Sequence, residues 1–111
     1  MNNHTTVTAV DALAPELLAE ARQHASHRAA RTLVSGTSQR ATLIALTQGA
    51  ELAEHDSPPA ATLHVITGTV RLHTHDTEWT LDSGHLAVIP PQRHGLAALT
   101  DAVVLLTVAL R

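Results

Sequence analysis

Histidine is the residue type through which this sequence could do chemistry. Nine of the 111 residues are histidine, and none is cysteine, tyrosine or phenylalanine. A neutral imidazole binds divalent metals and exchanges protons near neutral pH, so converging histidines indicate a metal, acid–base or ligand site. The lack of cysteine excludes disulfides, thiolate zinc sites, iron–sulfur clusters and cysteine nucleophiles. His55 and His94, each beside a loop that contains two consecutive prolines, are the strongest candidates.

The first candidate belongs to a pattern of glycines around His55. Gly49 precedes His55 with five residues between them, and the pattern ends at Gly68. Strand-forming residues lead up to Gly68, which stands where a hairpin turn is expected. We predict a positive φ angle at Gly68, because glycine is the residue that adopts this conformation at little cost.

The second candidate, His94, follows a similar pattern. Gly84 is separated from Pro90 by five residues, and a short turn then leads to His94. In this order the two patterns resemble the two motifs of the cupin superfamily. The first cupin motif reads glycine, five residues, His-x-His, three or four residues, glutamate, six residues and glycine. The second reads glycine, five residues, proline, a turn and a histidine, and His94 arrives one residue early.

The resemblance implies a binding site from which two usual ligands are missing. Metal-binding cupins use two histidines, a glutamate and a last histidine. By position His55 is the first and His94 the last, whereas Ser57 and Ala61 replace the other two. A serine hydroxyl is a poor ligand for borderline divalent metals, and alanine supplies none. We therefore predict a reduced pocket lined by His55, Ser57, Ala61 and His94, in which the two histidines hold a divalent metal (Zn, Fe, Mn, Ni or Cu) weakly, if one is bound.

The other histidines are expected to lie outside this site. Side chains alternate along a strand, so His64 faces away from Ala61 unless a bulge intervenes. His73 and His75 are interpreted as an exposed pair on one face of a strand, and His85 as a surface residue beside a turn. The histidines of the tail and of the helix end, for which we expect no role in a site, are His4, His24 and His27. Arg93 is expected to lie in solvent.

One amphipathic helix followed by many short strands is the expected architecture. Apolar residues recur at helical spacing, and either Asp11 caps the helix or Pro15 occupies its first position. A first short strand is expected at residues 32–34, and further strands follow at the spacing typical of a sandwich or barrel. The prediction is a single domain, residues 1–111, divided into a flexible tail (1–10), a helix (12–27) and an all-β, cupin-type jelly-roll barrel (30–111).

Composition and charge limit the classes of partner. The net charge of −3 argues against nucleic acid, and the lone aromatic residue, Trp79, leaves no platform on which bases could stack. The apolar stretches are far shorter than the roughly 20 residues of a membrane span. The first residues lack the basic and apolar regions of a secretion signal, so a cytoplasmic protein is expected.

Two functions remain open at this stage. In the first, the weakly held metal supports an oxygenase, isomerase or cyclase reaction on a small molecule, as the resemblance implies. In the second, the protein is a metal-free cupin that binds a small molecule in a sensory or accessory role. Acid–base catalysis by the same histidines lies between them. The resemblance also implies a homodimer that pairs through its sheets, and the closing strand, residues 103–110, has two apolar faces to bury.

Overall fold

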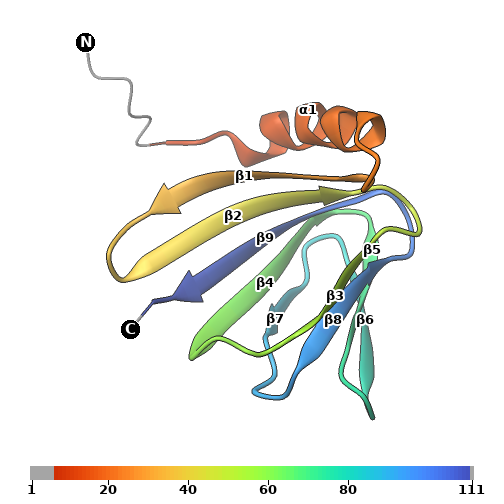
Figure 1. The fold of residues 1–111 in the computed structure, drawn as a ribbon. Helices are drawn as coiled ribbons and strands as arrows, with labels where there is room; N and C mark the ends of the chain where they lie inside the picture. The colour runs from red at the N-terminus through yellow and green to blue at the C-terminus, as the bar shows by residue number, and fades with distance from the viewer. Residues whose placement is uncertain (1–6, 111) are drawn as a thin grey trace.

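The computed structural model describes residues 7–110, which form one helix and two antiparallel sheets (Figure 1). One sheet has five strands in the order β1-β2-β9-β4-β7, and the other has four in the order β3-β8-β5-β6. The elements in chain order are α1 (Val10–Gln23), β1 (Arg28–Ser35), β2 (Gln39–Leu46), β3 (Glu51–His55), β4 (Ala60–Thr67), β5 (Thr69–His73), β6 (Glu78–Asp82), β7 (Leu86–Val88), β8 (His94–Ala98) and β9 (Ala102–Ala109). The predicted jelly-roll barrel with one N-terminal helix is confirmed.

The main core lies between the two sheets. Along β4, Ala61, Leu63 and Val65 are buried in this core, whereas the residues between them face outward. Val70 and Leu72 of β5 complete the core from the opposite sheet, as their alternation in the sequence predicts. The strands are short and rich in leucine, valine and alanine, so the core is filled without phenylalanine or tyrosine.

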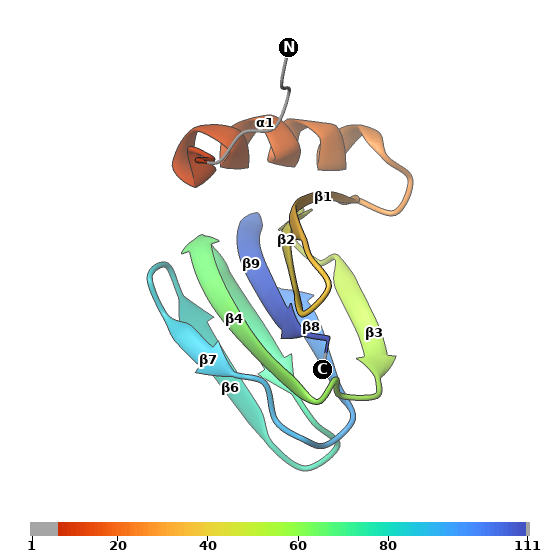
Figure 2. The ribbon, with the colours of Figure 1, turned by 90° about the vertical axis from the view of Figure 1, so that its left-hand side faces the viewer.

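A second core forms where helix α1 packs on the outer face of the five-stranded sheet. Ala14, Leu17 and Ala21 of the helix are buried against Leu43 and Val103 of the sheet. Figure 2 shows the helix lying outside the barrel, next to β1 and β2. β2 and β9 therefore bury residues on both of their faces, which explains their largely apolar sequences. The outer face of β9 is covered in part by α1. No helix formed by residues 7–110 has the length and apolar character that crossing a bilayer requires.

The helix is shifted towards the N-terminus relative to its predicted range of 12–27. It begins at Val10, because the Ala9 carbonyl accepts the first helical hydrogen bonds and no side chain caps the end. Neither Asp11 nor Pro15 begins it: Asp11 lies in the first turn, and Pro15 lies inside the helix on its exposed side. The helix ends at Gln23, and Arg22 is the basic residue of its last turn.

The residues after Gln23 form the turn in which the chain reverses direction between α1 and β1. His24 is extended and His27 has a φ angle of 58°, a tight turn after which Arg28 already pairs with Leu46 of β2. The first strand is therefore Arg28–Ser35, longer than the predicted residues 32–34. The predicted flexible tail, residues 1–10, overlaps the helix at Val10, and its residues 1–6, including His4, lie outside the described residues.

Three turns, at residues 47–50, 67–69 and 98–102, close one end of the barrel, which we call the closed end. The N–H of Gly49 donates to the carbonyl of Ala98 (2.9 Å), and Leu99 donates to the carbonyl of Thr69 (3.0 Å). Gly68 has a φ angle of 84°, as predicted, but β4 and β5 belong to different sheets, so the chain crosses from one sheet to the other here and the expected hairpin does not form. A Cβ atom at Gly68 would lie 2.2 Å from a backbone oxygen of the neighbouring turn, so the approach itself also requires glycine.

Asp101 joins these turns to the helix. Its carboxylate accepts a hydrogen bond from the Gln48 backbone N–H (2.8 Å) and another from the Arg22 guanidinium of α1 (2.9 Å). These two donors, the Gln48 N–H first, hold the pKa of the Asp101 carboxyl below its ordinary value. The closed end is thus fixed by backbone and side-chain hydrogen bonds together.

Candidate functional site

His55 and His94 lie opposite each other on neighbouring strands. His55 is the last residue of β3, His94 is the first of β8, and the strand register pairs them directly. β3 contains a bulge, because Leu52 pairs with Leu96 while His55, three residues later, pairs with His94. The extra residue reverses the alternation of side chains, so Leu52 and His55 face the same side.

The two imidazole rings meet edge to face. Their centroids are 4.6 Å apart and their planes are inclined by 63°, so the two predicted site histidines lie in contact. Nδ1 of His55 lies 3.0 Å from the carbonyl oxygen of Ala53, and Nδ1 of His94 lies 3.0 Å from that of Gln92. A carbonyl oxygen only accepts, so these contacts require the hydrogen on each Nδ1, and in that tautomer a neutral ring keeps a lone pair on Nε2.

A cavity of about 300 Å³ lies between the sheets and includes both histidines in its lining. His94 is buried, with 4% of its surface exposed, whereas His55 lies at the exposed rim. The other lining residues are mostly aliphatic and come from both sheets: Ile44, Leu52, Leu63, Leu72, Ile89, Leu96, Leu106 and Val108. We call this end of the barrel, formed by residues 55–61 and 88–94, the open end.

Ser57 and Ala61 also line this cavity, so the structure brings all four predicted site residues together. Ser57 is half-buried and its Oγ donates to the carbonyl of Pro58 (3.3 Å). Both residues also line a wider, more open groove of about 820 Å³ that continues towards the ends of β2 and β9. The cavity therefore has an approach from solvent along Ser57 and Ala61.

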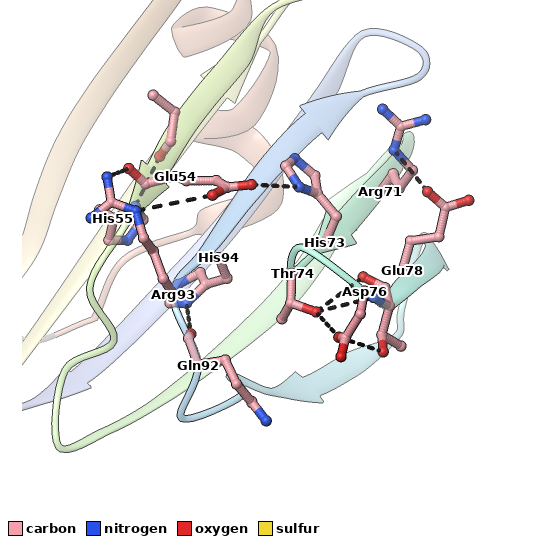
Figure 3. A network of polar contacts seen from close by, with 12 residues as sticks. Glu54, His55, Arg71, His73, Thr74, Asp76, Glu78, Gln92, Arg93 and His94 are labelled. Carbon is pink, nitrogen blue, oxygen red and sulfur yellow. Dashed lines mark hydrogen bonds and ion pairs between the residues drawn. The ribbon is translucent and has the colours of Figure 1, made fainter.

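Charged residues surround the rim on the outer face of the same strands (Figure 3). Glu54, in the bulge of β3, faces outward and lies 3.9 Å from Nδ1 of His73 and 4.0 Å from Nε of Arg93. Arg93 also lies 3.4 Å from Asp56 and donates to the backbone carbonyl of Glu54. Arg93 is exposed, as expected, and its guanidinium contacts these two carboxylates. Asp56, which no motif indicated, reaches the cavity lining.

The prediction that His73 and His75 form an exposed pair is wrong. β5 ends at His73, whose side chain is only 22% exposed, whereas His75 lies beyond the strand in solvent. The His73 ring lies over Gly95, where a Cβ atom would come within 2.8 Å of it. The small residue at position 95 makes room for this ring, and sequence spacing alone does not reveal such a contact.

The other histidines lie where they were predicted. His64 pairs with residues of β7 and β9 on the face opposite Ala61, and no bulge precedes it in β4. His85 is exposed, and its Nδ1 accepts a hydrogen bond from the Asp82 N–H (2.9 Å) within the β6–β7 turn. His24 and His27 are exposed at the helix end.

The turn after β5 carries a perturbed carboxyl outside the cavity. The hydroxyls of Thr74 and Thr77 donate to Asp76 at 3.0 and 3.1 Å (Figure 3 shows the Thr74 contact). These hydrogen bonds, the one from Thr74 first, lower the pKa of Asp76. Asp76 is fully exposed and orders the turn.

The residues at the site do not fit the four-ligand metal centre that the resemblance implies. Across residues 7–110, no three histidine or carboxylate side chains are placed to share one metal ion. Ser57 and Ala61 occupy the positions of the missing ligands, which leaves two imidazoles. Catalytic metal centres ordinarily have three protein ligands, so this donor set is incomplete.

Neither a protein-family model nor a curated protein matches the sequence. Solved structures do. A conserved protein of unknown function from Streptococcus pyogenes is 25% identical, with a TM-score of 0.70 over 78% of this chain and 76% of that chain. An RmlC-like cupin from Shewanella frigidimarina is 20% identical, with a TM-score of 0.68 over 76% and 77% of the two chains.

One match includes the N-terminal helix region. An RmlC-like cupin from Desulfovibrio desulfuricans is 19% identical, with a TM-score of 0.66, and the match covers 98% of this chain and 94% of that chain. The helix and the barrel of this chain therefore occur together in a solved structure of similar length. Similarity at these identities shows the fold.

Proposed function

Proceeding from a chain that has the cupin fold, we propose that it binds a small molecule in the cavity lined by His55 and His94. One observation carries the proposal: an aliphatic cavity between the sheets ends at two converging imidazoles, whose Nδ1 atoms already contact backbone carbonyls. Its volume of about 300 Å³ is at the lower end of the range of small-molecule pockets. The aliphatic walls favour an apolar part of the ligand, and the imidazoles orient its polar part.

Filling the cavity tests this proposal. We expect Ala61→Leu to occupy the cavity and to abolish binding of an apolar probe such as toluene, because Ala61 lies in its wall. Ala30→Leu is the matched control, since Ala30 is exposed on β1. Binding is measured by the shifts of the pocket methyl groups in ¹H–¹³C NMR spectra. Equal methyl shifts in the two variants on addition of toluene would contradict the proposal. The absence of any shift in the parent protein would contradict it as well.

The two Nε2 atoms favour a second candidate function, weak coordination of a divalent cation (Zn, Ni, Cu, Fe or Mn) by His55 and His94. Two imidazoles leave the remaining coordination positions to water, so this cation would be held less tightly than in a centre with three or four protein ligands. Titration with zinc chloride tests it. His55→Ala should abolish the zinc-dependent shift of the His94 ring, while His64→Ala, on the opposite face of β4, should preserve it. Zinc that binds equally to both variants would contradict this candidate.

A further inference from the structure

We propose that the cavity selects a ligand with an apolar body and a head group that donates hydrogen bonds, for which a primary ammonium is the best match. The inference rests on the proposed binding function and specifies the chemical class of the ligand. It depends on the polar atoms that face the cavity, on the charges at its rim and on its volume.

The imidazoles offer acceptors to a ligand. Nδ1 of His55 and Nδ1 of His94 already donate to the backbone carbonyls of Ala53 and Gln92, each at 3.0 Å. Within the described part of the chain, neither Nε2 atom has a hydrogen-bond partner. Nε2 of His94 is not among the buried unpaired atoms of the described residues, and His55 is exposed, so water reaches both rings. A ligand that displaces this water leaves the lone pairs unpaired unless it donates to them, so a ligand that donates to both Nε2 atoms is favoured over one that only accepts.

The rest of the lining adds no competing donor. The Ser57 hydroxyl donates to the carbonyl of Pro58 (3.3 Å), which leaves its lone pairs towards a ligand. Asp56 places its carboxylate at the exposed rim beside Arg93, and the other lining residues are aliphatic, proline or glycine. No lysine or arginine belongs to the lining. An anionic head group would therefore meet lone pairs and a carboxylate.

The charge of the rim also favours a cationic head group. The nearest cation, Arg93, lies between Asp56 (3.4 Å) and Glu54 (4.0 Å), so one guanidinium faces two carboxylates. The rim formed by these three residues carries a net charge of −1. A negative rim attracts a cationic ligand and repels an anionic one, with an effect that salt weakens.

The volume limits the apolar body to about one ring. A protein cavity of about 150 Å³ holds a benzene molecule. The cavity here, about 300 Å³, has room for one six-membered ring and a short arm that carries the head group to the imidazoles. Benzylamine, benzyl alcohol, benzoate and toluene share this body and differ in the head group alone.

The experiment compares the affinities of these four probes for the full chain after EDTA treatment, at pH 8.0 and low salt, by NMR titration. Benzylamine should bind at least about tenfold more tightly than toluene, as one charge-assisted hydrogen bond implies, and benzoate should bind more weakly than toluene. Benzyl alcohol should fall between benzylamine and toluene. His55→Phe should remove the preference for benzylamine over toluene and keep the binding of toluene.

Two variants that each remove one negative charge test whether the ammonium group of benzylamine binds near Asp56. Asp56→Asn should weaken benzylamine about threefold or more, because Asp56 lines the cavity, and Glu51→Gln should leave it unchanged. Glu51 is an exposed carboxylate at the other end of the same strand, so both variants remove one negative charge. Benzoate binding as tightly as benzylamine, or equal effects of the two variants, would overturn the inference. Failure of all four probes, toluene included, would overturn the proposed binding function itself.

Discussion

The two ends of this barrel are built from turns of similar length, yet they are held in different ways. At the closed end, Gly68 allows its turn to pack directly against the turn that contains Asp101. The Asp101 carboxylate accepts hydrogen bonds from Gln48 of a third turn and from Arg22 of the helix. At the open end, the loops around Pro58 and Pro90 are joined by fewer hydrogen bonds, such as that from the Ile89 N–H to the Ala61 carbonyl (3.0 Å). The interior of the open end is the aliphatic cavity.

Because of this difference, residues that stabilise the fold and residues that line the binding cavity lie at opposite ends of the same strands. β3 and β8 run from the closed end, where Glu51 pairs with Ala97, to the open end, where His55 pairs with His94. Packing and hydrogen bonds at the first end hold the strands in register, and the register brings the two imidazoles together at the second. We therefore expect substitutions at the closed end to lower stability and substitutions at the open end to change binding.

The largest expected effect is at Gly68. Gly68→Ala places a Cβ atom 2.2 Å from the Asp101 carbonyl oxygen at a φ angle of +84° and should destabilise the fold by about 2–4 kcal/mol. Gly49→Ala has a similar φ angle of +88° but no atom within 4 Å of its Cβ, so it should cost about 1 kcal/mol. Urea denaturation measures both. Equal losses would show that backbone conformation, rather than the close approach, makes Gly68 necessary.

A second comparison adds the same volume at each end. Ala102→Leu at the closed end, where Ala102 is fully buried, should destabilise the protein by about 1–3 kcal/mol through overpacking. Ala61→Leu should change stability by less than about 1 kcal/mol, because its side chain can enter the cavity. Thermal unfolding of the two variants decides this. A larger loss for Ala61→Leu than for Ala102→Leu would mean that the open end is packed as tightly as the closed end.

A smaller effect, dependent on pH, is expected at Asp101. Its pKa is lowered in the folded state, so its charge stabilises the fold above pH 4 and this contribution is lost as the pH falls through the folded-state pKa. Asp101→Asn should cost about 1 kcal/mol at pH 7, since the contact with Arg22 is solvent-exposed and weakened by screening. Denaturation of both proteins between pH 2 and pH 7 should show the difference shrinking below pH 4. A difference independent of pH would contradict the role given to the charge.

Much of the barrel could be predicted because it depends on local patterns. Alternation along Thr62–Thr67 predicts the buried and outward faces of β4, and the positive φ angle at Gly68 is found, whereas β4 and β5 pair in different sheets and do not form the expected hairpin. The helix boundaries were harder to predict, because α1 has no side-chain cap and its end is set by the pairing of Arg28 with Leu46, a contact between residues far apart in sequence.

The site could be predicted in part for the same reason. Motif spacing identified His55 and His94, which the register brings together. The bulge before His55 and the contact of His73 with Gly95 depend on how neighbouring strands meet, and no pattern within one strand encodes them. The same holds for Asp56, whose place in the lining follows from the path of a loop.

The proposed site requires that His55 and His94 carry their hydrogens on Nδ1 and leave both Nε2 atoms free to accept from a ligand. Long-range ¹H–¹⁵N NMR spectra of the imidazoles at pH 8.5, with parent, His55→Ala and His94→Ala proteins for assignment, test this claim directly. At this pH both rings should show the pattern of hydrogen on Nδ1. Hydrogen on Nε2 of either ring, or exchange between the two forms in both, would contradict the claim.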